Sequence, residues 1–221
     1  MKRRSIYVFV SATLAMIVPS PGRFVYGLVL ILLLNFLMLI GTFANSIVKK
    51  FKLGELQSTV IFTFLICGTI FFRQLMIMLN PEIVLTLGFV MYLTPVSFFV
   101  IGYLFNNDEE PFNKRVKFSF THSLTFSFYA LFIFLLRDIF GYGTLTYFGS
   151  GFQIVEKIIF PPEYLSIFSV FASIPGVLIL SSVILFFHIM SRNKLNIIRN
   201  TDSIKEDKKD DKKEDKKEEK K

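Results

Sequence analysis

The chain has 221 residues, of which 52% are hydrophobic, and its mean hydropathy is +0.55. A soluble domain of this length cannot bury so much apolar surface, so the composition predicts a membrane protein. The net charge of +8 does not indicate nucleic-acid binding, because the basic residues lie at the ends of the apolar segments, where they orient membrane proteins. The single cysteine, Cys67, excludes an internal disulfide or a four-cysteine metal site made by this chain alone.

Six apolar segments follow one another along the chain, and we expect each of them to be embedded in the bilayer. The first is only 13 residues long and is followed by Pro19 and Pro21, whereas the fourth carries Pro95 near its centre. The sixth contains Pro175 and should be kinked or begin with a loop. The segments are Ile6–Val18, Phe24–Val48, Val60–Leu79, Ile83–Phe105, Phe118–Leu136 and Tyr164–Met190.

Short or interrupted segments at matching places in two halves of a chain are typical of inverted repeats. We therefore predict an all-α membrane protein with six transmembrane segments, arranged as a 3+3 inverted repeat with short or broken helices at spans 1 and 4. Basic residues are numerous in every second connection, for example Lys49 and Lys50 after the second segment and Lys114 and Lys117 after the fourth. This alternation predicts that both termini are cytoplasmic.

The N-terminal end of the chain leaves one alternative open. Lys2–Arg4 followed by a short apolar core also fits a signal peptide, although Pro21 argues against cleavage after Ser20. Near the C-terminus, lysines and acidic residues alternate in pairs, so like charges stand four residues apart and oppose a helix. We expect residues 1–199 to form the membrane domain and residues 200–221 to be a disordered cytoplasmic tail.

Two of the polar residues inside the apolar segments are expected to make specific contacts. Arg73 stands in the third segment, where a central arginine costs about 2.5–3.5 kcal/mol, so it needs a partner or must reach the interface six residues away at Leu79. Asn35 stands in the second segment and is expected to form a hydrogen bond between helices.

The fifth connection, Arg137–Glu163, is rich in glycine and aromatic residues and is expected to lie along the outer membrane surface. Its Gly141-Tyr142-Gly143 resembles a potassium-channel filter, but the spacing excludes that function. Only four residues separate Gly141 from the fifth segment, which leaves no room for a pore helix.

The stretch Leu136-Arg137-Asp138-Ile139-Phe140-Gly141-Tyr142-Gly143-Thr144-Leu145 is the most specific pattern of the chain. It resembles the Arg-Glu-x-x-Gly-x-Gly-Thr-Leu motif after the fifth span of RnfE and NqrD, integral subunits of the Rnf and Nqr ion-translocating electron-transport complexes. The resemblance implies a six-helix inverted repeat with half-helices at spans 1 and 4, cytoplasmic termini, a location in the inner (cytoplasmic) membrane and a six-span paralogue of opposite orientation as partner. The candidate functional residues are Arg73, Pro95, Arg137, Asp138, Gly141 and Gly143.

The chain departs from this family at the redox cofactor. In the family, each of the two paralogues gives one cysteine from each half-helix to a shared [2Fe–2S] cluster, but Ser11 and Phe98 stand at the matching places here. We therefore expect no cofactor and no catalytic side chain in this chain. Two functions stay open: a diverged membrane subunit of an Rnf/Nqr-like complex, or a non-redox small transporter or structural scaffold with the same fold.

Overall fold

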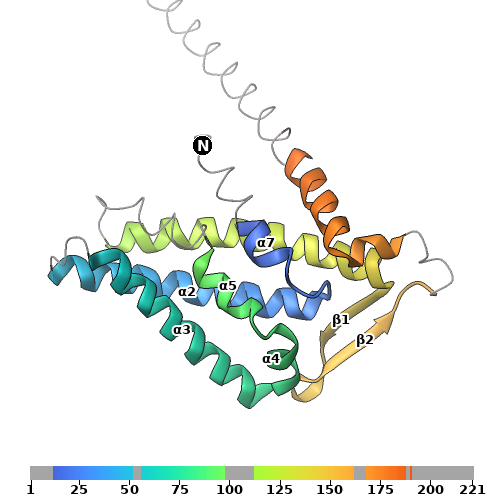
Figure 1. Cartoon of the computed structure of the whole chain (residues 1–221), viewed down its shortest axis with the longest axis horizontal. Helices are drawn as coiled ribbons and strands as arrows, with labels where there is room; N and C mark the ends of the chain where they lie inside the picture. Colours follow the sequence, from blue (N-terminus) through green and yellow to red (C-terminus); the bar gives the residue numbers. More distant parts are fainter. Residues whose placement is uncertain (1–11, 52–55, 98–111, 162–167, 188–189, 191–221) are drawn as a thin grey trace, which may run out of the picture. The chain divides into compact units, whose positions relative to one another are not determined.

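The computed structural model of the chain describes residues 12–51, 56–97, 112–161, 168–187 and 190. Most of these residues are helical (Figure 1). The chain divides into two compact units, Met1–Ile179 and Leu180–Lys221, and every contact discussed below lies within the first.

Three long helices dominate the described part of the chain: α2 (Phe24–Phe51), α3 (Gln57–Leu79) and α7 (Phe112–Tyr142). Each contains a stretch that is long and apolar enough to cross a membrane. They confirm the predicted second, third and fifth segments. α7 continues six residues beyond the predicted end at Leu136, so Asp138 lies inside it.

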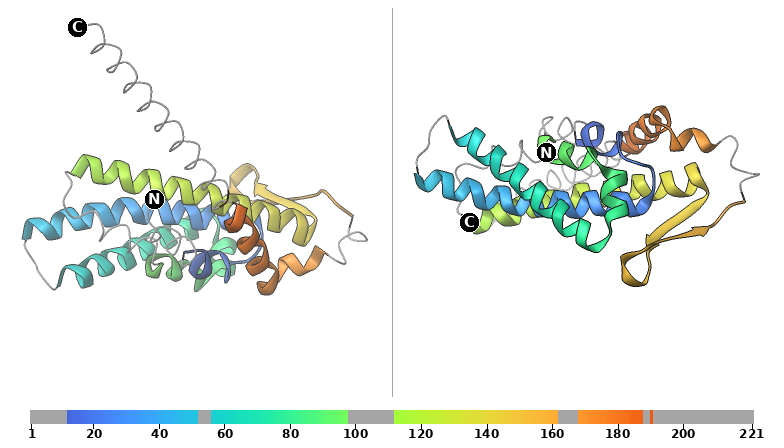
Figure 2. Two further views of the ribbon diagram at one scale, coloured as in Figure 1. Left: turned by 90° about the horizontal axis from the view of Figure 1, so that it is seen from above. Right: turned by 60° about the horizontal axis from the view of Figure 1, so that its bottom comes forward.

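α2 packs against both α3 and α7, and Figure 2 shows α2 and α7 side by side in both views. The two helices are antiparallel, and polar side chains join them at mid-length. Ser123 Oγ donates to Asn35 Oδ1 at 2.7 Å, and Asn35 Nδ2 donates to Ser127 Oγ at 2.9 Å. These bonds confirm the helix–helix role predicted for Asn35. Much of the remaining contact surface of α2 is apolar and includes the fully buried Leu30, Leu33, Leu34 and Leu37.

In the residues that the structure describes, the fourth segment is broken, as predicted, and the first contains only a short helical turn. The described part of the first is the π-helical turn η1 (Thr13–Ile17), and the fourth consists of α4 (Pro81–Leu87) and α5 (Val90–Val96). A seven-residue helix is only about 10 Å long, so neither α4 nor α5 alone crosses a bilayer. η1 packs against α5.

The position of the break in the fourth segment differs in part from the prediction. The chain turns at Gly88, whose φ of 43° ends α4, and not only at Pro95. Pro95 is buried in the last turn of α5, which ends one residue later at Val96 because proline offers no N–H to the carbonyl of Met91. Residues 98–105 of this segment and residues 6–11 of the first lie outside the described residues.

A two-stranded antiparallel sheet corrects the all-α prediction. β1 (Thr144–Phe148) pairs with β2 (Ile154–Ile158), with Thr144 opposite Ile158 and Phe148 opposite Ile154. The short 3₁₀ turn η3 (Ser150–Phe152) connects them. The fifth connection is therefore a β-hairpin in which threonine and β-branched residues form strands and glycines form the turn.

The last described elements are the 3₁₀-helix η5 (Phe168–Ala172) and an apolar helix, Ile174–Phe187. The interruption at Ser173 confirms that the sixth segment does not begin as one straight helix. The described helix of this segment, Ile174–Phe187, is shorter than a membrane span. Within the described residues three helices reach spanning length, and the six-span 3+3 arrangement stays a prediction. Residues 200–221, the predicted tail, lie outside the described residues.

Candidate functional site

Arg137 and Asp138, near the C-terminus of α7, are the most deeply buried charged residues that the structure describes. Their exposed fractions are 3% and 0%. Consecutive residues on a helix point about 100° apart, so the two side chains meet different neighbours. We name these residues, with Gly141, Gly143, Thr144 and Thr146, the Arg137–Asp138 cluster.

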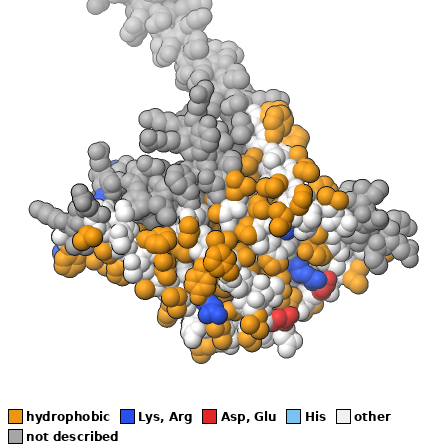
Figure 3. Space-filling model, viewed as in Figure 1, with side chains coloured by type: hydrophobic (Ala, Val, Ile, Leu, Met, Phe, Trp, Pro, Cys, Tyr) orange, Lys and Arg blue, Asp and Glu red, His pale blue; other side chains and the backbone are white. Residues whose placement is uncertain are grey.

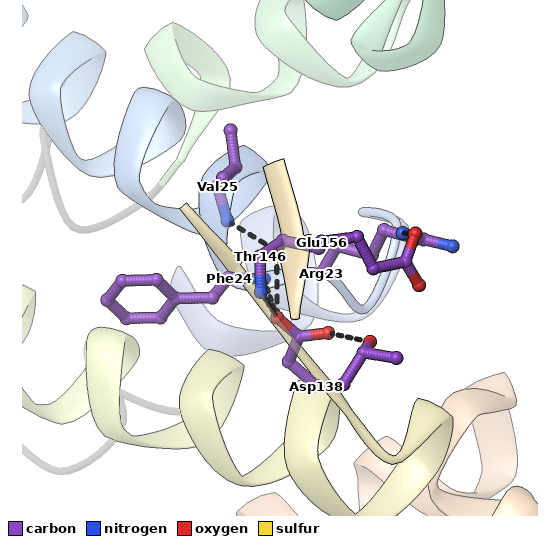
Figure 4. A network of polar contacts seen from close by, with 7 residues as sticks. Arg23, Phe24, Val25, Asp138, Thr146 and Glu156 are labelled. Carbon is purple, nitrogen blue, oxygen red and sulfur yellow. Dashed lines mark hydrogen bonds and ion pairs between the residues drawn. The ribbon is translucent and has the colours of Figure 1, made fainter. Parts of the chain in front are cut away.

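The carboxylate of Asp138 accepts four hydrogen bonds, most of which are visible in Figure 4. Thr146 donates to Oδ2 from both its backbone N–H and its hydroxyl, each at 2.7 Å. The N–H of Phe24 donates to the same oxygen at 3.1 Å, and the hydroxyl of Thr144 donates to Oδ1 at 3.1 Å. The carboxylate therefore joins the end of α7 to β1 and to the start of α2.

These bonds satisfy the N-terminus of α2, whose first N–H groups have no partner within the helix. Asp138 takes the N–H of Phe24, and the hydroxyl oxygen of Thr146 accepts from the N–H of Val25 at 3.3 Å. A carboxylate at this end of a helix also interacts favourably with the helix dipole. Asp138 thus acts as an N-cap supplied by a residue more than a hundred positions away in the sequence.

Whereas Asp138 accepts hydrogen bonds from N–H groups, Arg137 donates hydrogen bonds to backbone carbonyl groups. Its Nη1 donates to the carbonyl oxygens of Ile17 at 3.3 Å and Ser20 at 2.8 Å, and its Nη2 donates to that of Ala172 at 3.0 Å. Ile17 ends η1 and Ala172 ends η5. A guanidinium suits these positions because carbonyl groups at helix C-termini are unpaired and partly negative. Arg137 therefore ties the first apolar segment to the last one.

Glycine is required at each of the two glycine positions of the Gly-Tyr-Gly triplet for a different reason. A Cβ on Gly141 would lie 2.8 Å from the backbone nitrogen of Ala172, so only glycine lets η5 approach α7 this closely. Gly143 ends α7 with φ of 68°, the left-handed conformation typical of helix C-caps. Its carbonyl then accepts from the N–H groups of Ile159 and Phe160.

An exposed ion pair lies beside the cluster. Arg23 Nη1 is 2.6 Å from Glu156 Oε2 on β2, and the guanidinium lies 5.3 Å from the ring centre of Tyr142. The hydrogen bond to Glu156 raises the pKa of Arg23 above its ordinary value, against the lowering effect of partial burial. The pair adds a second link between the start of α2 and the hairpin (Figure 4).

The structure brings together four of the six predicted site residues, namely Arg137, Asp138, Gly141 and Gly143. Arg73 on α3 and Pro95 on α5 make no contribution to the cluster. The sequence analysis missed Thr144 and Thr146 as ligands of Asp138, although their alternation places both on one face of a strand. No sequence pattern of this kind indicated that Arg23 and Glu156 form an ion pair.

Chemically, the Arg137–Asp138 cluster holds elements in position. Both oxygens of Asp138 are engaged by donors, and the residue is fully buried, so the carboxylate is not offered to a substrate. Among the residues that the structure describes, no group of three His, Cys, Asp or Glu side chains is arranged to hold a metal ion. Cys67 is exposed on α3, away from the cluster.

No known protein-family model matches the chain, and no curated protein is similar enough in sequence to count as a relative. The fold and the site therefore define a structural class of protein and no particular family. The described chain is a mainly helical protein with three helices long enough to span a membrane, fastened at one end by a buried Arg–Asp pair and a β-hairpin.

Proposed function

We propose that the protein is an integral membrane subunit of an Rnf/Nqr-like ion-translocating electron-transport complex, diverged and without the usual cluster cysteines. In this proposal it forms part of the membrane core of the complex, next to a six-span paralogue of opposite orientation. It carries no catalytic side chain of its own, and its location is the inner (cytoplasmic) membrane.

The observation that carries the proposal is the set of contacts made by the motif residues. Arg137, Asp138, Gly141, Gly143 and Thr144 are the positions that match the RnfE/NqrD motif, with aspartate in place of glutamate at 138. All five have specific structural tasks in one cluster. Leu145 also matches the motif and is not part of this network, so the support for the resemblance comes from the contacts of the other five positions.

The correspondence between the two halves of the chain also supports the proposal. α2 and α7 follow the short segments in their respective halves, and they pack antiparallel against each other. η1 and α5 belong to the two short segments themselves, and they are also in contact. An inverted repeat requires such pairs of equivalent elements around a pseudo-two-fold axis.

Charge distribution supports an orientation with the Arg137–Asp138 cluster on the outer side. Because α2 and α7 are antiparallel, Lys49 and Lys50 at the end of α2 lie at the same end of the helix pair as Lys114 and Lys117 at the start of α7. Basic residues favour the cytoplasmic side. The hairpin and the cluster lie at the opposite end, which this rule assigns to the exterior.

The contact between η1 and α5 is the place where an ion path is expected in this proposal. Three hydroxyl residues there, Thr13, Thr94 and Ser97, are almost completely buried. Thr13 forms a hydrogen bond with Tyr129 of α7, whereas Thr94 Oγ1 has no partner in the described part of the chain. Polar groups at interrupted helices are typical of the sites where membrane proteins handle ions.

The redox part of the proposal concerns the cluster. Ser11 and Phe98, the positions that match the family's cysteines, lie outside the described residues, and serine and phenylalanine are poor ligands for iron. We predict that the reduced complex gives no [2Fe–2S] signal by electron paramagnetic resonance, and that Cys67→Ser keeps nearly full activity. A signal that disappears in this variant would overturn the assignment.

Purification from native membranes in a mild detergent, followed by partner identification, tests the proposal. The expected result is stable co-purification with a second six-span protein and with flavin-bearing subunits. Purification of the chain alone, in a form that is active without these subunits, would contradict the proposal and favour a non-redox transporter.

A further inference from the structure

The helix α3 is less buried than the other two long helices, α2 and α7. Only 28% of its most apolar stretch is buried, compared with 61% for α2 and 50% for α7. In Figure 3, hydrophobic side chains cover much of the described surface, and charged groups stand at isolated places. The large exposed side chains of α3 include Phe64, Ile70, Phe71, Leu75, Ile77 and Met78.

Arg73 lies at the edge of this face, between Ile70 and Ile77, which are each about one turn away. It is only partly buried, yet its Nε is inaccessible and has no hydrogen-bond partner. No hydrogen bond or ion pair joins Arg73 to any residue that the structure describes. A cation on an apolar helix face without an anion is costly. The described chain supplies no anion to compensate the charge of Arg73.

Reaching the nearer membrane surface does not resolve the problem. Arg73 is six residues, or about 9 Å, from the end of α3 at Leu79. In a helix, the Cα–Cβ bond tilts toward the N-terminus, which directs the side chain of Arg73 away from Leu79 and along α3 toward Ile70. The Nε of Arg73 lies buried against the protein, although the side chain as a whole is only partly buried.

We propose that this face of α3 is the contact surface for a transmembrane helix of a partner subunit, and that a carboxylate of that helix pairs with Arg73. Charge complementarity requires an anion at this depth, and bidentate pairing with a carboxylate suits a guanidinium. The long helices of a second copy do not supply it, because α2 and α3 contain no acidic residue and Asp138 of α7 is fully buried and engaged. The inference rests on the proposed function, which requires membrane partners.

A photo-crosslinking amino acid, benzoylphenylalanine, at Ile70 tests the inference in native membranes. Ile70 is 49% exposed and lies on the side to which Arg73 leans. Phe43, which is 59% exposed on α2, takes the same probe as a position outside the proposed surface. The Ile70 probe should yield an adduct whose partner peptide is a membrane-spanning segment with an Asp or Glu, and the Phe43 probe should not capture that segment.

Substitution of Arg73 then tests the ion pair itself. Arg73→Leu should lower the yield of the Ile70 adduct on the order of tenfold. Gln74→Leu removes an exposed polar side chain next to it and should leave the yield unchanged. Because Arg73 has no bond within the described chain and its charge is uncompensated there, Arg73→Leu should not lower the unfolding temperature of the isolated subunit.

Four results would overturn the inference: an adduct with lipid alone, an adduct with a second copy of this chain, a yield that does not depend on Arg73, or a lower unfolding temperature of the isolated Arg73→Leu subunit. The outcome is separable from that of the proposed function. Capture of a membrane protein unrelated to a six-span paralogue would refute the proposed function but keep the inference. Co-purification of the paralogue without an Ile70 adduct would do the reverse.

Discussion

Replacement of Asp138 by leucine is the sharpest perturbation of the Arg137–Asp138 cluster. It removes every acceptor that the carboxylate offers to α2 and β1, and the larger leucine side chain adds a packing cost at this fully buried position. The backbone N–H groups of Phe24 and Thr146 then stay buried without a partner. Each such group costs about 1–3 kcal/mol, and loss of the charge at the start of α2 adds about 0.3–1 kcal/mol. We expect a total loss of roughly 2–7 kcal/mol in the free energy of unfolding.

Asp138→Asn separates the charge from the hydrogen bonds. If the amide oxygen takes the place of Oδ2, it keeps the three bonds to Phe24 and Thr146 but turns an NH₂ group toward the hydroxyl of Thr144. The threonine hydroxyl can rotate to accept that bond. We expect a smaller loss of about 1–2 kcal/mol, because neutral hydrogen bonds are weaker than charge-assisted ones.

The assay is unfolding of the full chain in detergent or bilayers, followed by its helical circular dichroism. Glu156→Gln is the matched control, because it removes a carboxylate from an exposed ion pair in the same region and should cost less than about 1 kcal/mol. Equal stability of Asp138→Leu and Glu156→Gln would refute the argument that the buried carboxylate holds α2, β1 and α7 together.

Three further substitutions test other parts of the packing by the same measurement. Arg137→Leu removes the guanidinium donors from the carbonyl groups of Ser20 and Ala172 and should cost about 2–4 kcal/mol, more than the exposed Arg23→Leu. Gly141→Ala places a methyl group against the backbone of Ala172 and should cost about 1–3 kcal/mol. Asn35→Leu removes the polar link between α2 and α7 and should cost only about 0.6–1.7 kcal/mol, as is typical within membranes.

The parts of the fold that follow from local pattern could be predicted from the sequence. α2 and α3 are long apolar runs between basic or glycine-containing connections, so hydropathy alone locates them. Pro95 marked the fourth segment as broken, because proline cannot continue the hydrogen-bond ladder of a helix. The second break at Gly88 was missed, since glycine is common in membrane helices and does not by itself end one.

The parts that depend on distant contacts could not be predicted from local pattern. The sequence ends the fifth segment at Leu136 because two charged residues follow it, but α7 continues through them. Burial of Arg137 and Asp138 depends on acceptors and donors from η1, η5 and the start of α2, which are far away along the chain. The motif resemblance indicated which residues matter, whereas their tasks as caps became clear only from these contacts.

The membrane orientation underlies the proposed function, the outer position of the Arg137–Asp138 cluster and the partner surface on α3, so its direct measurement is the most decisive test. Reporter fusions along the full chain report on which side of the membrane each connection lies. Fusions after Lys52, Asn113 and Arg199 should read cytoplasmic, and a fusion after Gly151, in the turn of the hairpin, should read external. A cytoplasmic reading at Gly151 or an external reading at Arg199 would contradict the account.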